Sequence, residues 1–170
     1  MKILIDRKTR EEKVERLLLE NYDRYYRLAF SYVHNADDAS DIVQNGAYKA
    51  IRNSSGLKNQ EYAATWLYRI MLNEIYDFFR QRKTISIEAL EESGEAEPAG
   101  TDTYQDFDLR AALDALGLED KLVVELRYFE DMKLEEIAEI LNENLSTVKS
   151  RLYRSLKKLR VRLSEKDEVI

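Results

Sequence analysis

Residues 126–160 read LRYFEDMKLEEIAEILNENLSTVKSRLYRSLKKLR, and this stretch predicts two helices joined by a short turn. The first helix is expected at residues 134–141 and the second from 146 to about 163. Only four or five residues separate the two helices. A turn of that length between two such helices is typical of a helix-turn-helix.

The second of these helices has an apolar face and a cationic face when it is plotted at about 100° per residue. The apolar face gathers Val148, Leu152, Leu156, Leu159 and Leu163. The opposite face presents Ser150, Tyr153, Arg154 and Lys157, flanked by Lys149 and Arg151. These residues lie in the first three turns, the part of a recognition helix that enters the major groove of DNA. A solvated basic face is the simpler reading, but residues 146–164 hold seven Lys or Arg and no acid, which favours DNA binding.

Composition favours an all-α protein without enzymatic machinery. The 170 residues include one Pro and five Gly, while the strong helix formers Leu, Glu, Lys, Arg and Ala abound. The absence of Cys and the single His34 exclude disulfides, thiol nucleophiles and multi-histidine metal clusters. No apolar stretch approaches the ~20 residues that span a bilayer, and the start lacks the apolar core of a signal peptide. We expect a cytoplasmic protein with no membrane insertion, no cofactor and no metal.

The net charge of −6 is unevenly distributed. Residues 84–108 hold eight acids and no base, and residues 92–103 contain the only Pro. We interpret residues 84–107 as an acidic, flexible linker. It would join a three- to four-helix domain at residues 1–83 to a four-helix domain at residues 108–170 that contains the helix-turn-helix.

Three amphipathic helices are predicted in the N-terminal domain. The first buries a face made of Val14, Leu18, Tyr22, Tyr25, Ala29 and Tyr32. The second is capped by Asn35 and buries Ala39, Ile42, Val43, Ala47 and Ala50. The third runs from about Tyr62 to Lys83, with an apolar side of Leu67, Ile70, Met71, Ile75 and Phe78.

Two polar patterns on these helices could carry function. The second helix has a narrow polar stripe of Asp37, Asp41, Gln44 and Tyr48 within about 60°. Taken alone, the stripe is an ordinary solvent face with acids placed for the helix dipole. A metal site is less favoured, since nothing else nearby supplies oxygen ligands at a defined spacing. The third helix mixes aromatic and cationic residues, which suits unstacked bases and phosphates as well as a core. Its members are Trp66, Tyr68, Arg69, Asn73, Tyr76, Phe78, Phe79, Arg80, Arg82 and Lys83.

The C-terminal domain is predicted to begin with two further helices. Asp108 opens the first, and Leu109, Ala112, Leu113 and Leu116 form its apolar side. Gly117 is expected to end it as a left-handed stop. The next helix is predicted at residues 119–129.

Three segments, in this order, resemble the successive regions of an extracytoplasmic-function sigma factor of the sigma-70 family. They are DASDIVQNGAYKAI (38–51), TWLYRIMLNEIYDFFRQRK (65–83) and the helix-turn-helix stretch quoted above. The resemblance covers about residues 12–163. It implies two helical domains joined by an acidic linker that follows the RNA exit path of the polymerase.

The resemblance also implies a role for each pattern. The stripe of Asp37, Asp41, Gln44 and Tyr48 would dock on the clamp coiled coil of the beta-prime subunit of core RNA polymerase, and the C-terminal domain on the beta flap. Minus-ten promoter DNA would be captured by Trp66, Arg69, Asn73, Arg80, Arg82 and Lys83, with Asn73 as the base contact. Minus-thirty-five DNA would be bound by Thr147, Lys149, Ser150, Arg151, Tyr153, Arg154 and Lys157, with Thr147 and Arg151 on phosphates. An anti-sigma factor, membrane-bound or soluble, would regulate the chain.

Three residues depart from the family pattern. Lys133 stands where a Ser or Thr usually caps the first helix of the helix-turn-helix, Asn142 replaces the usual turn Gly, and Glu143 replaces an apolar turn residue. These departures affect the expected turn geometry rather than the function. A stand-alone DNA-binding regulator is the alternative, whereas a hydrolase built on Asp37, Asp38 and Asp41 lacks a nucleophile, a phosphate loop and a histidine.

Overall fold

The computed structural model describes residues 2–89 and 104–167. All the regular secondary structure of these residues is helical. This confirms the all-α prediction. The chain divides into two compact units, Met1–Gly94 and Glu95–Ile170. The part of the predicted linker at residues 90–103 lies outside the described residues.

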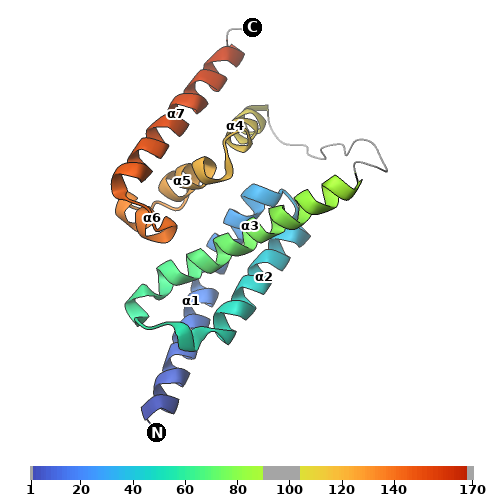
Figure 1. Cartoon of the computed structure of the whole chain (residues 1–170). Coiled ribbons are helices and arrows are strands. Elements are labelled where there is room, and N and C mark those ends of the chain that lie inside the picture. Colours follow the sequence, from blue (N-terminus) through green and yellow to red (C-terminus); the bar gives the residue numbers. More distant parts are fainter. Residues whose placement is uncertain (1, 90–103, 168–170) are drawn as a thin grey trace. The chain divides into compact units, whose positions relative to one another are not determined.

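Unit 1 contains three long helices, α1 (Lys2–Val33), α2 (Ala36–Arg52) and α3 (Ala63–Ala89) (Figure 1). Two short 3-10 turns, η1 (Ser54–Gly56) and η2 (Gln60–Tyr62), connect α2 to α3. All three long helices contact one another. Their shared core contains Val14, Leu18, Tyr25, Leu28, Ala29, Val43, Leu67, Met71 and Ile75.

The predicted face of α1 is correct except at Tyr22, whose exposed fraction is 42%. Two steps of four residues from Val14 rotate Tyr22 by about 80° away from it, toward the edge of the apolar face. Its ring instead stacks on Tyr26, with centroids 6.4 Å apart. Leu28, which the spacing pattern omitted, is buried in the core.

Helix α2 begins as predicted, because the Asn35 side chain accepts a hydrogen bond of 3.0 Å from the Asp38 amide. Four of its five predicted core residues are buried, but Ala47 is only half-buried and Gly46 is buried in its place. A Cβ at Gly46 would lie 2.5 Å from Met71 Sδ. The glycine therefore permits the close approach of α2 and α3.

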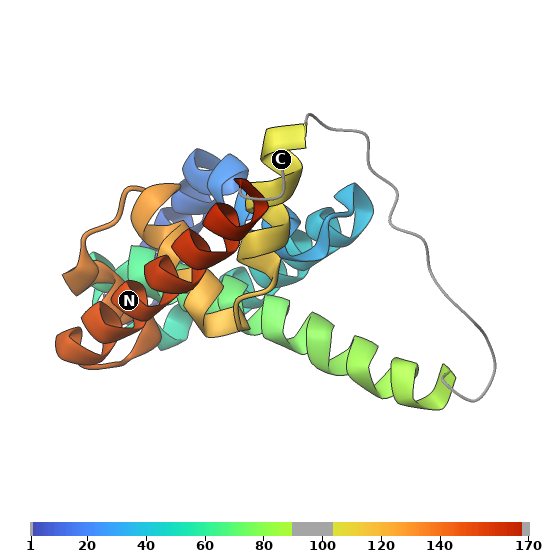
Figure 2. The ribbon, with the colours of Figure 1, turned by 90° about the horizontal axis from the view of Figure 1, so that it is seen from above.

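Unit 2 contains α4 (Tyr104–Asp114), α5 (Leu118–Tyr128), α6 (Leu134–Leu141) and α7 (Leu145–Asp167). Helices α4, α5 and α6 all contact α7 (Figure 2). The core includes Leu113, Leu122, Leu126, Ile137, Val148, Leu152 and Leu159. Asn142 adopts the left-handed conformation between α6 and α7, with φ 53° and ψ 45°, as a turn residue replacing Gly must. The helix-turn-helix is thereby confirmed.

Three predicted helix ends differ from the structure. Helix α3 continues through Ala89 and α4 already begins at Tyr104. The segment 84–89, TISIEA, begins the acidic stretch of the sequence, but it contains no Gly or Pro to end a helix. Gly117 is not a left-handed stop: its φ of −61° and ψ of 157° make it the extended residue that precedes α5.

Candidate nucleic-acid and partner interfaces

The polar stripe of α2 forms one exposed surface, as the sequence spacing predicted. Asp37, Asp41, Gln44 and Tyr48 are all exposed, and Tyr48 retains 64% of its accessible surface. Gln44 Nε2 donates a hydrogen bond of 3.3 Å to Ser40 Oγ on the same helix. An exposed tyrosine on the same face as two carboxylates offers both apolar area and negative charge to a partner.

Contacts between α2 and α3 hold this surface in place. Lys49 Nζ of α2 forms an ion pair and hydrogen bond with Glu74 Oε1 of α3, whose side chain is 9% exposed. The hydrogen bond to Glu74 raises the pKa of Lys49, so this ammonium keeps its proton to a higher pH than a free lysine does. Together with the packing of Gly46 on Met71, this pair fixes the rotation of α2 about its own axis.

The predicted minus-ten residues of α3 divide by exposure. Asn73, Arg80, Arg82 and Lys83 are exposed, whereas Trp66 and Arg69 are half-buried. Arg69 lies over the Tyr62 ring, with its Cζ 5.5 Å from the centroid. Phe78, expected in the core, is only half-buried, and Arg82 Cζ lies over its ring at 4.9 Å from the centroid.

Two of these cations also contact acids. Arg82 Nη2 lies 3.2 Å from Asp38 Oδ2 in the first turn of α2, and Arg80 pairs with Asp77 on α3. Sequence reasoning did not find the Arg82–Asp38 contact, because it joins residues 44 positions apart. Both arginine side chains are exposed, whereas Asp38 is 27% exposed and Asp77 40% exposed, so neither pair is buried and each contributes little to stability.

Helix α7 presents the cationic face that the sequence predicted. Thr147, Lys149, Ser150, Tyr153, Arg154 and Lys157 are all exposed. Val148, Leu152 and Leu159 are buried on the other side. Arg154 Nε bonds only weakly to the Ser150 carbonyl, at 3.4 Å. These hydroxyl, phenol and cationic groups are the kinds that meet base edges and phosphates.

Arg151 is placed differently from the other predicted DNA residues. Its side chain is 16% exposed and pairs with Glu119 at 2.8 Å, Glu143 at 3.2 Å and Asp120 at 3.3 Å. Burial alone would lower the pKa of Arg151. The nearby carboxylates of Glu143, Glu119 and Asp120 raise this pKa by more than burial lowers it, so the net shift is upward. The three acids are functional candidates that sequence reasoning missed, because two of them lie more than 30 positions from Arg151.

Two further features concern residues 2–89 and 104–167, the part of the chain that the structure describes. No group of three or more metal-ligating side chains gathers there. No helix of that part is long and apolar enough to cross a membrane.

Comparison with known proteins agrees with this arrangement. The sigma-70 region 2 family matches residues 17–85, and the sigma-70 region 4 family matches residues 106–159. The RNA polymerase sigma factor SigV of Bacillus subtilis (strain 168) is 46% identical over 143 residues, covering 84% of this chain and 86% of SigV. The extracytoplasmic-function sigma factor SigW of the same organism is 30% identical over 164 residues, covering 84% of each chain.

Solved structures give the same result. The sigma factor RpoE, in complex with the anti-sigma factor NepR from Bartonella quintana, matches with a TM-score of 0.72 and 25% identity over 88% of this chain and 96% of that one. A helical pair of units with a helix-turn-helix in the second is the architecture of a sigma-70-type initiation factor. The chain belongs to the extracytoplasmic-function group of the sigma-70 family. Members of this family bind core RNA polymerase and direct promoter-specific transcription initiation.

Proposed function

We propose that this chain is a cytoplasmic, non-enzymatic initiation factor in which each exposed surface has one task. The stripe of Asp37, Asp41, Gln44 and Tyr48 docks on the clamp coiled coil of the beta-prime subunit. Unit 1 then captures the opened minus-ten strand and unit 2 reads the minus-thirty-five duplex and meets the beta flap. Residues 84–107 would join the two units. The first six of them belong to α3 and the last four to α4.

The main support for this proposal is that each functional surface lies on the exposed side of its helix, opposite the side that packs into the core. On α2, every stripe residue is exposed while the opposite side packs into the core. On α7, the cationic face is exposed while Val148 and Leu152 are buried. Each surface is therefore available to a partner without any change in the fold.

Strand capture on α3 rests on Asn73, with phosphate contacts from Arg69, Arg80, Arg82 and Lys83. Asn73 is exposed and its amide offers both a donor and an acceptor to an unpaired base. Half-buried Trp66 lies on the same helix and supplies a ring for stacking. The exposed ion pairs of Arg80 and Arg82 would exchange their carboxylates for phosphates when DNA binds.

Run-off transcription tests the proposal directly. Purified core polymerase would be mixed with the chain and a library of genomic promoter fragments. An initiation factor yields discrete transcripts only when both proteins are present, and it binds the same fragments weakly alone. A stand-alone regulator would bind a duplex tightly without core and would start no transcripts.

Control by an anti-sigma factor is the remaining part of the proposal. It is supported by the likeness to the RpoE chain solved with NepR. The test is the co-purification of the tagged chain from its host with a protein that, once purified, blocks run-off transcription in proportion to its concentration. Undiminished transcription at saturating amounts of every co-purifying protein would contradict this part.

A further inference from the structure

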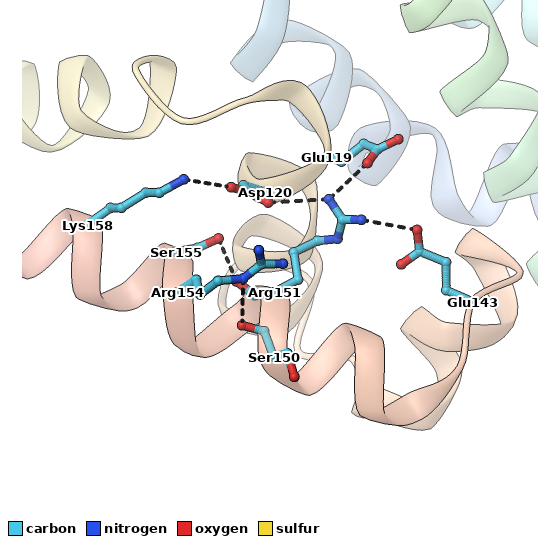
Figure 3. Close-up of polar contacts among 8 residues, drawn as sticks. All are labelled: Glu119, Asp120, Glu143, Ser150, Arg151, Arg154, Ser155 and Lys158. Carbon is cyan, nitrogen blue, oxygen red and sulfur yellow. Dashed lines mark hydrogen bonds and ion pairs between the residues drawn. The ribbon is translucent and has the colours of Figure 1, made fainter.

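One guanidinium connects three parts of unit 2 (Figure 3). Arg151, on the second turn of α7, directs Nη1 to Glu119 and Asp120 in the first turn of α5, and Nη2 to Glu143 in the turn between α6 and α7. Asp120 also accepts from Lys158 Nζ of α7, at 3.2 Å. We call these five residues the Arg151 cluster.

The cluster leaves Arg151 poorly suited to hold a DNA phosphate. Both Nη atoms already face carboxylates, and Nε is buried without a hydrogen-bond partner. Three carboxylates oppose the two cations Arg151 and Lys158, so the cluster itself holds one more acid than base. A phosphate that approached the Arg151 guanidinium would have to displace one of these carboxylates before it reached a donor.

The same cluster compensates for the unusual turn of this chain. An apolar residue would pack the turn against α7, but the residue here is Glu143, which is half-buried. Glu143 is held by Arg151 instead, while Asn142 supplies the left-handed bend. A planar fork that meets several carboxylates constrains direction as well as distance. The contact to α5 limits the rotation of α7, and the contact to Glu143 limits how far its first turn projects.

We infer that Arg151 is a positioning residue that orients the recognition helix for the minus-thirty-five duplex through Glu119, Asp120 and Glu143, and that it binds no phosphate. This inference rests on the proposed function of unit 2. Arg151 is thereby reassigned from the phosphate contact that the sequence resemblance implied. Base reading and anchoring then belong to the exposed residues of the same helix.

The two roles differ in salt dependence and in sequence preference. Loss of a phosphate contact weakens all duplexes alike and reduces the slope of log affinity against log salt by about 0.9. Loss of orientation weakens the promoter duplex more than a scrambled one and leaves the slope unchanged. The measurement uses holoenzyme of the full chain, with a fragment that yields run-off transcript and a scrambled fragment of equal length.

For Arg151→Ala we expect about a tenfold or greater loss on the promoter fragment, a smaller loss on the scrambled one, and the wild-type slope. Arg160→Ala removes an exposed cation from the other side of α7 and is the matched control, with nearly wild-type binding. Hydrogen exchange in the turn at residues 141–147 should accelerate in Arg151→Ala alone. An equal loss on both fragments with a reduced slope, or unchanged affinity, would overturn the inference.

Two further variants keep the test decisive if Arg151→Ala unfolds unit 2. Arg151→Lys keeps the charge, so it would preserve most of a phosphate contact but lose the three-way fork. We expect it to lose promoter preference nearly as far as Arg151→Ala. The Arg151→Gln and Glu143→Gln changes should also be less costly together than the sum of the two singly, because they break one contact. A preserved preference in Arg151→Lys, or strict additivity, would refute positioning.

The wild-type holoenzyme separates this inference from the function on which it rests. If it fails to prefer the promoter fragment over the scrambled one, the proposed function of unit 2 fails, and the inference with it. If it shows the preference and the Arg151 variants behave as phosphate contacts, the inference alone fails.

Discussion

Replacing Lys133 by Thr should stabilise unit 2, because α6 begins without a side-chain cap. Lys133 has the extended backbone of an N-cap residue, with φ −72° and ψ 151°, but its ammonium accepts no hydrogen bond. Half of a capping box is already present: Glu136 Oε2 accepts from the Lys133 amide at 2.8 Å. A Thr hydroxyl would supply the other half by accepting from the Glu136 amide.

The gain has two parts. A side-chain acceptor at an N-cap is worth ~1 kcal/mol. Removing a cation from the positive end of a helix dipole adds about 0.3–1 kcal/mol. Lys133 is exposed, so its replacement costs little packing. The sum is about 1–2 kcal/mol, and in a domain of this size each 1 kcal/mol raises Tm by about 4–8 °C.

Thermal unfolding of the full chain, followed by circular dichroism, measures the gain, and hydrogen exchange of residues 134–141 assigns it to α6. Lys133→Ala is the matched control, because it removes the cation without adding an acceptor. We expect Lys133→Thr to exceed Lys133→Ala by ~1 kcal/mol. Equal stability of the two variants would refute the capping argument.

Three further predictions concern the surfaces and the α2–α3 contact. Arg154→Ala should cost ~1–3 kcal/mol in holoenzyme binding to the promoter fragment and much less on a scrambled duplex; equal losses, measured by fluorescence anisotropy, would make Arg154 an anchor. Asn73→Ala should reduce permanganate reactivity at the minus-ten element without changing binding to a minus-thirty-five duplex, and wild-type footprints would leave Asn73 with a structural role only. The raised pKa of Lys49 means that its ion pair with Glu74 stabilises unit 1 fully below the unfolded pKa near 10.5 and loses this effect as pH rises through the folded pKa. Because the reference pKa of lysine is ~10.4, the free energy of unfolding of wild type and of Lys49→Met, measured in urea titrations, should differ by a constant amount from about pH 6 to about pH 9. A difference that fades in this range would contradict the pairing.

Most of the helices could be predicted from the sequence, because capping residues and apolar spacing act over only a few residues. Asn35 is an N-cap whose acceptor lies three residues from its donor, and the bounds 134–141 of α6 follow from apolar spacing and a turn. The stripe of α2 and the cationic face of α7 were also predictable, since residues on one helix keep fixed angular positions. The burial of Gly46 was not predictable, because it depends on how closely α3 approaches α2.

The contacts at the candidate sites that the sequence did not predict share a physical cause. A resemblance assigns a role to Arg151 by its place in a motif, but what that side chain does depends on acids at positions 119, 120 and 143 that the fold brings near. Arg82 and Asp38 meet for the same reason. Charge along a single helix therefore identifies the face, whereas tertiary contacts decide which cations on it are available to a partner.

The most direct test of the account is whether the stripe of α2 binds core polymerase. The variant Asp41→Arg with Gln44→Ala changes two exposed residues opposite the buried side of α2, so its circular dichroism should match that of wild type. Glu15→Arg, an equal charge reversal at an exposed site on α1, is the control. We predict that the double variant no longer co-elutes with core polymerase on gel filtration and that Glu15→Arg co-elutes as wild type does. Co-elution of the folded double variant at wild-type levels would show that the stripe of α2 does not bind core polymerase.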